Sequence, residues 1–188
     1  MAKFLANGTR EHDMQKINAV VAVYSTHSQA EEALHAFQSS GFDMKKLSIV
    51  GKDYHTEDHV IGFYNAGDRM KFWGKRGAFW GGFWAMLFGS ALFLIPGFGH
   101  VMVLGPLVGW IVGAMGEAAV VGGLTALGAG LYSIGIPKDS ILKYETALRA
   151  DQFVVVAHGT LDEVTTAKRI LEKTSALSVD EHGAPAGV

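Results

Sequence analysis

Residues 74–99 read GKRGAFWGGFWAMLFGSALFLIPGFG, and the fold depends on whether this stretch stays in water. It opens a segment from Gly77 to Ile136 that contains no lysine or arginine and a single acid, Glu117. A helix of about 20 apolar residues crosses the hydrocarbon core of a bilayer. The charge-free segment is about three times that length, so the sequence predicts a membrane insertion.

Proline and glycine divide the apolar segment into two predicted helices. Pro96 and the Gly105-Pro106 pair are helix-breaking signals. We therefore expect helices over residues 78–95 and 107–134, separated by a break over 96–106. Gly122-Gly123 marks a further point of interruption within the second helix.

Small residues recur at every fourth position of both predicted helices. This spacing gives each helix a flat seam, and such seams let helices associate in lipid. In water, each helix-interior glycine costs about 0.5–1 kcal/mol relative to alanine. The predicted helix-packing glycines are Gly77, Gly81, Gly89, Gly105, Gly109, Gly113, Gly122 and Gly130.

The regions on either side of the insertion, residues 17–70 and 137–182, each predict a β-α-β unit. In the first unit, valine-rich residues 18–24 and residues 46–51 read as strands. Ser28 offers a capping box with Glu31 for the helix between them, and Gly41 stops that helix. In the second unit, Pro137 opens a helix, and further apolar patterns predict a strand over 153–158, a helix over 162–173 and a short strand over 177–180.

Two such units predict one α+β domain of the ferredoxin-like class, in two halves. The roughly 85 residues between the halves exceed any ordinary loop, so residues 71–136 are predicted to form an inserted hydrophobic helical hairpin. Residues 1–16 are expected to be a flexible lead and residues 183–188 a flexible tail.

Basic and aromatic residues before the insertion indicate its orientation. Both ends of the insertion return to one sheet, so the number of crossings must be even, and two helices satisfy this. Cations on the flanks and none in the connecting loop predict that both ends face the cytoplasm. The N-terminus lacks an apolar run typical of a signal peptide, which agrees with that side. The predicted membrane-surface collar comprises Arg69, Lys71, Trp73, Lys75, Arg76, Trp80 and Trp84.

Few residues suggest chemistry. Glu117 is an acid within an apolar helix, where a carboxylate indicates proton or cation handling, or a bond to a neighbouring helix. His100 in the connecting loop is either a pH-sensitive group or simply solvated. A cluster of four side chains could hold a divalent metal but is more typical of a hydrated turn: His55, Glu57, Asp58 and His59.

Composition excludes several classes of function. The net charge of −2 and the lack of a basic stripe argue against nucleic-acid binding. Zero cysteines exclude disulfides, thiolate metal sites and cysteine nucleophiles. No serine–histidine–aspartate set, P-loop or dinucleotide fingerprint is present. We therefore predict no catalytic residue, no resident metal and no cofactor, and hence a protein that is not an enzyme.

Two long stretches carry a resemblance to a known family: GFYNAGDRMKFWGKRGAFWGGFWAMLFG at 62–89 and LTALGAGLYSIGIPKDSILKYETALRADQFVVVAHG at 124–159. With the flanking β-α-β units, they resemble bacterial membrane-associated proteins related to the general stress proteins induced by heat or cold. The resemblance covers roughly residues 17–175, and some members are labelled permeases. It implies the two-halved architecture and a stress association, and supplies no catalytic residues.

Together these features predict a non-enzymatic, stress-associated protein of the bacterial inner membrane. It would self-assemble as a homo-oligomer through its glycine seams and organise, stabilise or sense the bilayer. One alternative is an oligomeric transporter or channel that uses Glu117. Another is a soluble homo-oligomeric regulatory module that buries the hairpin in subunit interfaces, with a small-molecule ligand of unknown identity on the sheet.

Overall fold

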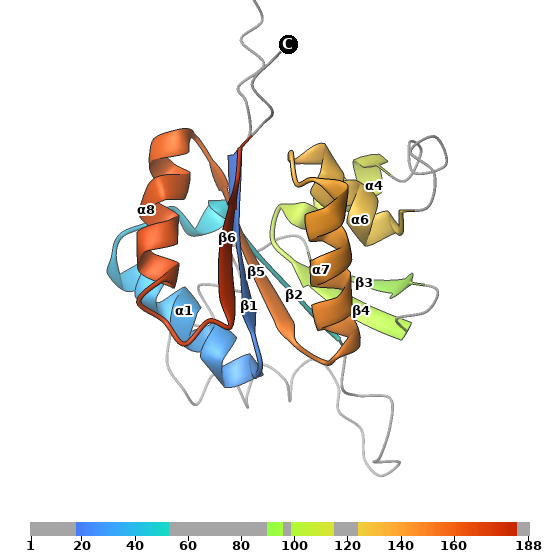
Figure 1. The fold of residues 1–188 in the computed structure, drawn as a ribbon, viewed down its shortest axis with the longest axis horizontal. Coiled ribbons are helices and arrows are strands. Elements are labelled where there is room, and N and C mark those ends of the chain that lie inside the picture. The colour runs from blue at the N-terminus through green and yellow to red at the C-terminus, as the bar shows by residue number, and fades with distance from the viewer. Residues whose placement is uncertain (1–17, 53–89, 96–98, 115–123, 184–188) are drawn as a thin grey trace, which may run out of the picture.

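The computed structural model describes residues 18–52, 90–95, 99–114 and 124–183 and shows an α+β fold (Figure 1). One six-stranded antiparallel sheet forms its middle layer. Helices α1 and α8 cover one face of the sheet, and α4, α6 and α7 lie on the other (Figure 1). The elements are β1 (Asn18–Tyr24), α1 (His27–Ser39), η1 (Met44–Lys46), β2 (Leu47–Lys52), β3 (Ser90–Ile95), β4 (Gly99–Leu104), α4 (Leu107–Ala114), α6 (Ala126–Ser133), α7 (Lys138–Arg149), β5 (Phe153–Gly159), α8 (Leu161–Leu171) and β6 (Ser178–His182).

Four strands of the sheet come from two interleaved β-α-β units. The strand order is β3-β4-β2-β5-β1-β6, so β5 lies between β1 and β2, and β1 lies between β5 and β6. Val21 pairs with Val156, and Ile49 pairs with Val155. The strands and helices predicted for both units are confirmed, with boundaries shifted by a few residues. Interleaving places the two halves of the chain in one sheet, although they are distant in sequence.

Valine-rich β1 and β5 occupy the middle of the sheet because both of their faces are covered. Val20 and Val155 pack with α1 and α8, whereas Val21 and Val156 pack into the layer of α4, α6 and α7. All four side chains are fully buried, at 0% exposure. Continuous apolar runs, rather than alternating ones, are typical of strands with two buried faces.

The start of α1 differs from its prediction. Thr26, not Ser28, is the N-cap residue, and its hydroxyl accepts a hydrogen bond from the backbone N–H of Gln29 at 3.3 Å. Thr26 has the extended backbone of a cap residue, whereas Ser28 already lies inside the helix. Both positions offer a hydroxyl, and the true start lies two residues earlier.

The prediction of a helix reaching residue 95 is wrong. Ser90–Ile95 is strand β3, and Gly99–Leu104, expected within the break, is strand β4. The two strands pair antiparallel along their whole length, and β4 also pairs with β2. Two apolar runs of six residues around a glycine- and proline-containing turn favour a hairpin, and periodicity alone does not distinguish such runs from helix. Gly99 has a φ of +82°, which suits glycine.

The prediction of a single helix over 107–134 is also wrong. Helix α6 begins at Ala126, and Leu124 and Thr125 before it are not helical. The Thr125 hydroxyl caps α6 by accepting from the backbone N–H of Gly128 at 3.0 Å. The helix cap at Thr125 thus lies two residues after the interruption expected near Gly122-Gly123. Gly122 and Gly123 themselves lie outside the described residues.

Much of the predicted insertion forms the second core layer of the sheet. Within the described ranges, no helix combines the length and the apolar character needed to cross a membrane. The side chains of this part lie against the sheet, and their burial explains the lack of charge in the described residues of the segment. The side chains of this part that are at most 2% exposed include Ile95, Val101, Val103, Leu107, Ile111, Leu127, Leu131, Ile134 and Ile136.

Candidate functional site

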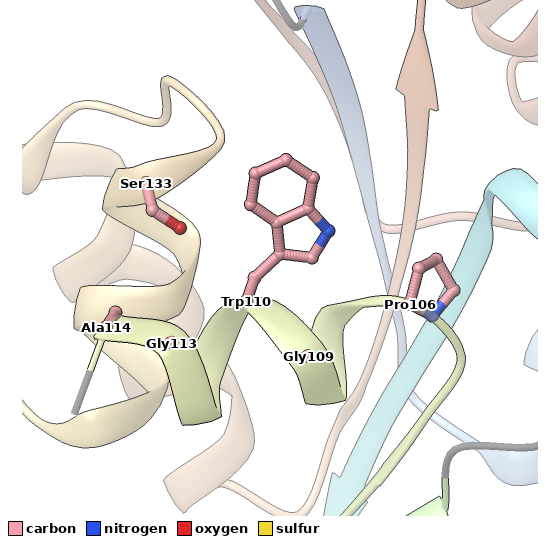
Figure 2. Close-up of a pocket in the computed structure, with 6 residues that line it drawn as sticks. All are labelled: Pro106, Gly109, Trp110, Gly113, Ala114 and Ser133. Atoms are coloured by element: carbon pink, nitrogen blue, oxygen red, sulfur yellow. The ribbon is translucent and has the colours of Figure 1, made fainter.

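Helix α4 borders an open groove of about 400 Å³ near the end of α6 (Figure 2). The indole of Trp110 rises from α4 on one side of the groove, and Ser133 of α6 lies on the other (Figure 2). The residues that line the groove are Pro106, Gly109, Trp110, Gly113, Ala114 and Ser133. The groove therefore joins an aromatic ring, a glycine-lined helix surface and one hydroxyl.

A close turn fixes the start of α4 against strand β2. Gly105 has a φ of +94°, and a Cβ there would collide with the backbone carbonyl oxygen of Leu47. Two residues later, the backbone N–H of Leu107 donates to the buried Ser48 hydroxyl at 3.1 Å. The hydroxyl satisfies one of the free N–H groups at the helix start. Strand β2 thus positions the first turn of α4.

A second glycine brings α4 and α6 into close contact. A Cβ on Gly130 would lie 2.5 Å from Cγ1 of Ile111 and 3.0 Å from its Cα. Such distances leave no room for a side chain, so Gly130 permits the backbones of the two helices to approach. This glycine packs two helices of one chain together.

The outer surface of α4 has the opposite character. Among the described residues, a Cβ added to Gly109 or Gly113 would meet no atom within 4 Å. Val112, between them, is 58% exposed, and Tyr132 on α6 is 46% exposed. We call Gly109, Val112 and Gly113 the α4 glycine face. It is apolar and flat, and a second surface could approach its backbone closely.

Trp110 also connects the groove to the end of strand β5. Its ring meets the ring of His158 edge-on, with centroids 6.2 Å apart. Burial, followed by the positive charge of Lys46, lowers the pKa of His158 below its ordinary value. His158 is therefore neutral at pH 7, and it presents an uncharged ring to the indole.

A buried carboxylate holds α6 to α7. Glu145 of α7 is only 6% exposed, and its Oε1 accepts a hydrogen bond from the Thr125 hydroxyl at 2.6 Å. The same hydroxyl caps α6 at Gly128. Thr125 thus serves as cap and as partner of a buried acid, which fixes the start of α6.

A polar cluster outside the groove joins α7 to the edge strand β6. The Tyr144 hydroxyl lies 2.6 Å from Nε2 of His182 and donates to Asp180 at 3.3 Å, and Lys143 pairs with Asp180 at 2.6 Å. Burial raises the pKa of Tyr144 and lowers that of His182. Burial alone would raise the pKa of Asp180, but its hydrogen bond and charge interaction with Lys143 lower it.

The structure gives the predicted helix-packing glycines different roles. Gly105 forms a turn, Gly130 packs within the chain, and Gly109 and Gly113 face open space. His100, expected in a loop, lies in strand β4 opposite Leu94. The remaining site residues lie outside the described residues, and their roles stay predictions: Gly77, Gly81, Gly89, Gly122, Glu117, Arg69, Lys71, Trp73, Lys75, Arg76, Trp80, Trp84, His55, Glu57, Asp58 and His59.

The sequence prediction missed the groove and its anchors. Trp110 is an aromatic residue in an otherwise aliphatic helix, and this isolation was a usable signal. Ser48 and Thr125 carried weaker signals, because a hydroxyl within or between apolar runs fits many environments. Their partners, Leu107 and Glu145, are 59 and 20 residues away in sequence.

The comparison with protein families supports the stress association. The family described as "Heat induced stress protein YflT domain" matches residues 19–92, from β1 into β3, which is less than half of the chain. The match supports a family like the general stress proteins, and a stress-protein domain fits a stress-associated role. Neither a curated protein nor a solved structure matches the chain significantly.

Proposed function

We propose that the protein is a non-catalytic, stress-associated module that self-assembles through the α4 glycine face. The observation that carries this proposal is that no described residue covers Gly109 or Gly113. Each exposed glycine in a helix costs about 1 kcal/mol relative to alanine. A surface that keeps two of them one turn apart, beside an exposed valine, suits the close approach of another helix.

The fold supports a role in binding rather than in crossing a bilayer. The interleaved order of β1, β2, β5 and β6 supports a ferredoxin-like assignment for these four strands. Strands β3 and β4 extend that sheet, and α4 and α6 add a layer on its second face. In this proposal, stress-linked activity comes from assembly on that added layer.

Sizing by light scattering tests the proposal, with Gly113→Leu as the informative variant. The added side chain has free space in the single chain, so folding should persist while the assembly falls apart. Thr146→Leu, which adds a leucine to an exposed position of α7, is the matched control and should keep the wild-type mass. A monomeric wild type at micromolar concentration, or an unchanged mass for Gly113→Leu, would contradict the proposal.

A second candidate function is attachment to the cytoplasmic surface of the bilayer through the predicted collar. Lys52 ends β2 and Ser90 begins β3 of the same sheet, so a membrane insertion between them would need an even number of crossings. Two spanning helices need about 40 residues before any turn is counted. The interval is shorter than that, which favours surface attachment over a two-helix hairpin. Tryptophans and cations are typical of such attachment.

Flotation with lipid vesicles tests the surface attachment. The wild type should float with anionic vesicles at low salt and should be released by a carbonate wash or by 0.5 M salt. At that salt concentration the Debye length is only about 4–5 Å, so the attraction between cations and headgroups is screened. Lys75→Gln with Arg76→Gln should weaken flotation several-fold, whereas Arg169→Gln with Lys173→Gln on and after α8 should not. Protein that resists carbonate would instead be integral, and equal flotation of both double variants would also refute this candidate.

A further inference from the structure

The two edge strands of the sheet differ sharply in charge. Edge strand β6 carries Asp180 and Glu181, which form ion pairs with Lys143 of α7 at 2.6 Å and Lys168 of α8 at 3.1 Å. Edge strand β3, SALFLI, has no charge and no proline. Natural proteins use charges and proline on edge strands to prevent pairing with other chains. Strand β6 has such protection, and β3 lacks it.

Strand β3 is also held in an extended form that another strand could join. It pairs with β4 along all six of its residues, from Ser90 opposite Leu104 to Ile95 opposite Gly99. Within the described sheet, β4 is its only strand neighbour. An edge strand presents backbone N–H and C=O groups on its outer side.

The side chains of β3 make this edge apolar on both faces of the sheet. Phe93 and Ile95 pack with the core under α4, α6 and α7. Leu94 lies on the other face and is 72% exposed. Helices α1 and α8, which cover that face, contact β1 and β5 in the middle of the sheet, far from β3 in the strand order.

We propose that β3 pairs antiparallel with β3 of a second copy of this chain, which joins the two six-stranded sheets into one. This inference rests on the proposed self-assembly and assigns it a second, distinct surface. Identical edges that meet about a twofold axis form a closed pair. Pairing of β3 with β6 of another copy would instead propagate into filaments, and it would have to accommodate Asp180 and Glu181. The uncharged edge therefore fits its own copy best.

Charge substitution at Leu94 tests the pairing. With residues 90–95 of both copies paired, the two Leu94 positions lie about 10 Å apart across the twofold axis. Leu94→Lys and Leu94→Glu therefore each place like charges near one another, and each variant alone should lose the β3 pairing and show a lower mass than the wild type. An equimolar mixture should recover the wild-type mass, because lysine then faces glutamate. Leu142→Lys on α7, at a leucine that is 56% exposed, is the matched control and should leave the mass unchanged. Loss of mass without recovery in the mixture would overturn the proposal.

Chemical cross-linking of introduced thiols gives a second measurement that does not depend on charge. The chain has no cysteine, so Leu94→Cys introduces a single thiol. With residues 90–95 of both copies paired, the two introduced thiols lie about 10 Å apart along the strands, which is too far for a disulfide. A bismaleimide with a spacer of about that length should therefore link Leu94→Cys into a covalent dimer, and it should not link Leu142→Cys. No enrichment of the dimer for Leu94→Cys over Leu142→Cys would overturn the pairing at this strand.

The outcomes separate this inference from the proposed function. If Gly113→Leu lowers the mass and Leu94→Lys does not, assembly through α4 stands and the β3 pairing is wrong. If Leu94→Lys lowers the mass and the charge mixture restores it, the β3 pairing stands whatever Gly113→Leu shows. A wild type that is monomeric at every concentration refutes both.

Discussion

The hydroxyl of Tyr144 links helix α7 to edge strand β6 through two hydrogen-bond partners. It lies 2.6 Å from Nε2 of His182 and 3.3 Å from the carboxylate of Asp180. Tyr144 is fully buried, and burial raises its pKa, so the hydroxyl stays protonated and donates at any physiological pH. A buried polar group that loses its partner costs more than the bond itself contributes. The hydroxyl is therefore a strong determinant of how β6 is held.

Tyr144→Phe should destabilise the fold by about 1–3 kcal/mol, because Asp180 loses a hydrogen-bond donor and Nε2 of His182 loses its hydrogen-bond partner. The measurement is urea unfolding followed by circular dichroism. Tyr132→Phe removes the hydroxyl of a tyrosine that is 46% exposed and should change stability by less than about 0.5 kcal/mol. If the two substitutions lower the free energy of unfolding equally, the hydrogen bonds of the buried Tyr144 hydroxyl do not stabilise the fold.

Thr125 offers a second test at a single position. Thr125→Ala removes both the cap of α6 and the partner of the buried Glu145 carboxylate, so we expect a loss of about 1–3 kcal/mol. Thr125→Ser keeps the hydroxyl and should recover most of that loss. If serine is as destabilising as alanine in the same urea titration, the methyl group rather than the hydroxyl carries the effect.

Helices α4 and α6 show that glycines in a four-residue repeat can serve opposite purposes. Gly130 lies against Ile111 with no room for a Cβ, whereas Gly109 and Gly113 face open space. The repeat predicted a shared helix-packing role for all of them. Sequence spacing identifies a flat helix surface, and only the tertiary arrangement decides whether that surface is already occupied.

Alanine substitutions at these glycines should therefore change the stability of the fold in opposite directions. Gly109→Ala and Gly113→Ala should each stabilise the fold by about 0.5–1 kcal/mol through helix propensity. Gly130→Ala should destabilise it by about 1–3 kcal/mol, because the methyl group overpacks against Ile111. Urea unfolding at two protein concentrations separates the stability of the fold from that of any assembly. Destabilisation by Gly113→Ala at both concentrations would show that this helix face is already covered within one chain.

The elements of the two β-α-β units could be predicted because their patterns are local. Valine-rich strands, capped amphipathic helices and the stop at Gly41 need no knowledge of the rest of the chain. The insertion could not be predicted in the same way, because a lack of charge is common to a bilayer span and to a layer buried on a sheet. What distinguished them for residues 90–104 was the length of each apolar run and the turn signal between the runs.

The groove is less predictable than the fold, because its parts come from distant positions. Trp110 and Ser133 lie on helices separated by a further segment, and the contact that sets their spacing is Gly130 against Ile111. Nothing local to either residue specifies that contact. The spacing of small residues predicts flat helix surfaces, but it does not specify which surface the molecule leaves open.

The stability of the whole fold depends on pH through histidines that burial keeps neutral. Burial lowers the pKa of His27, His158 and His182. The positive charge of Lys46 adds to this effect at His158, whereas at His182 the charge of Asp180 opposes it and that of Lys143 adds to it. The three residues lie on α1, β5 and β6, so acid acts on several elements at once. Asp180 and Glu163 also have lowered pKa values, and such carboxylates lose their contribution as the pH falls from their ordinary pKa towards the lower folded one, which is more acidic than the range in which histidines titrate.

Stability should therefore fall as the pH drops from 7.5 to 5, and the histidines determine the sign. Because their pKa values in the folded state lie below the unfolded value of about 6.5, the unfolded chain binds more protons in this range, and stability rises with pH. The urea midpoint should decrease steadily over the interval. Replacing His158 and His182 with asparagine should flatten the dependence, whatever the cost of the substitutions at pH 7.5. An unchanged slope in that double variant would show that other groups control the acid sensitivity of the fold.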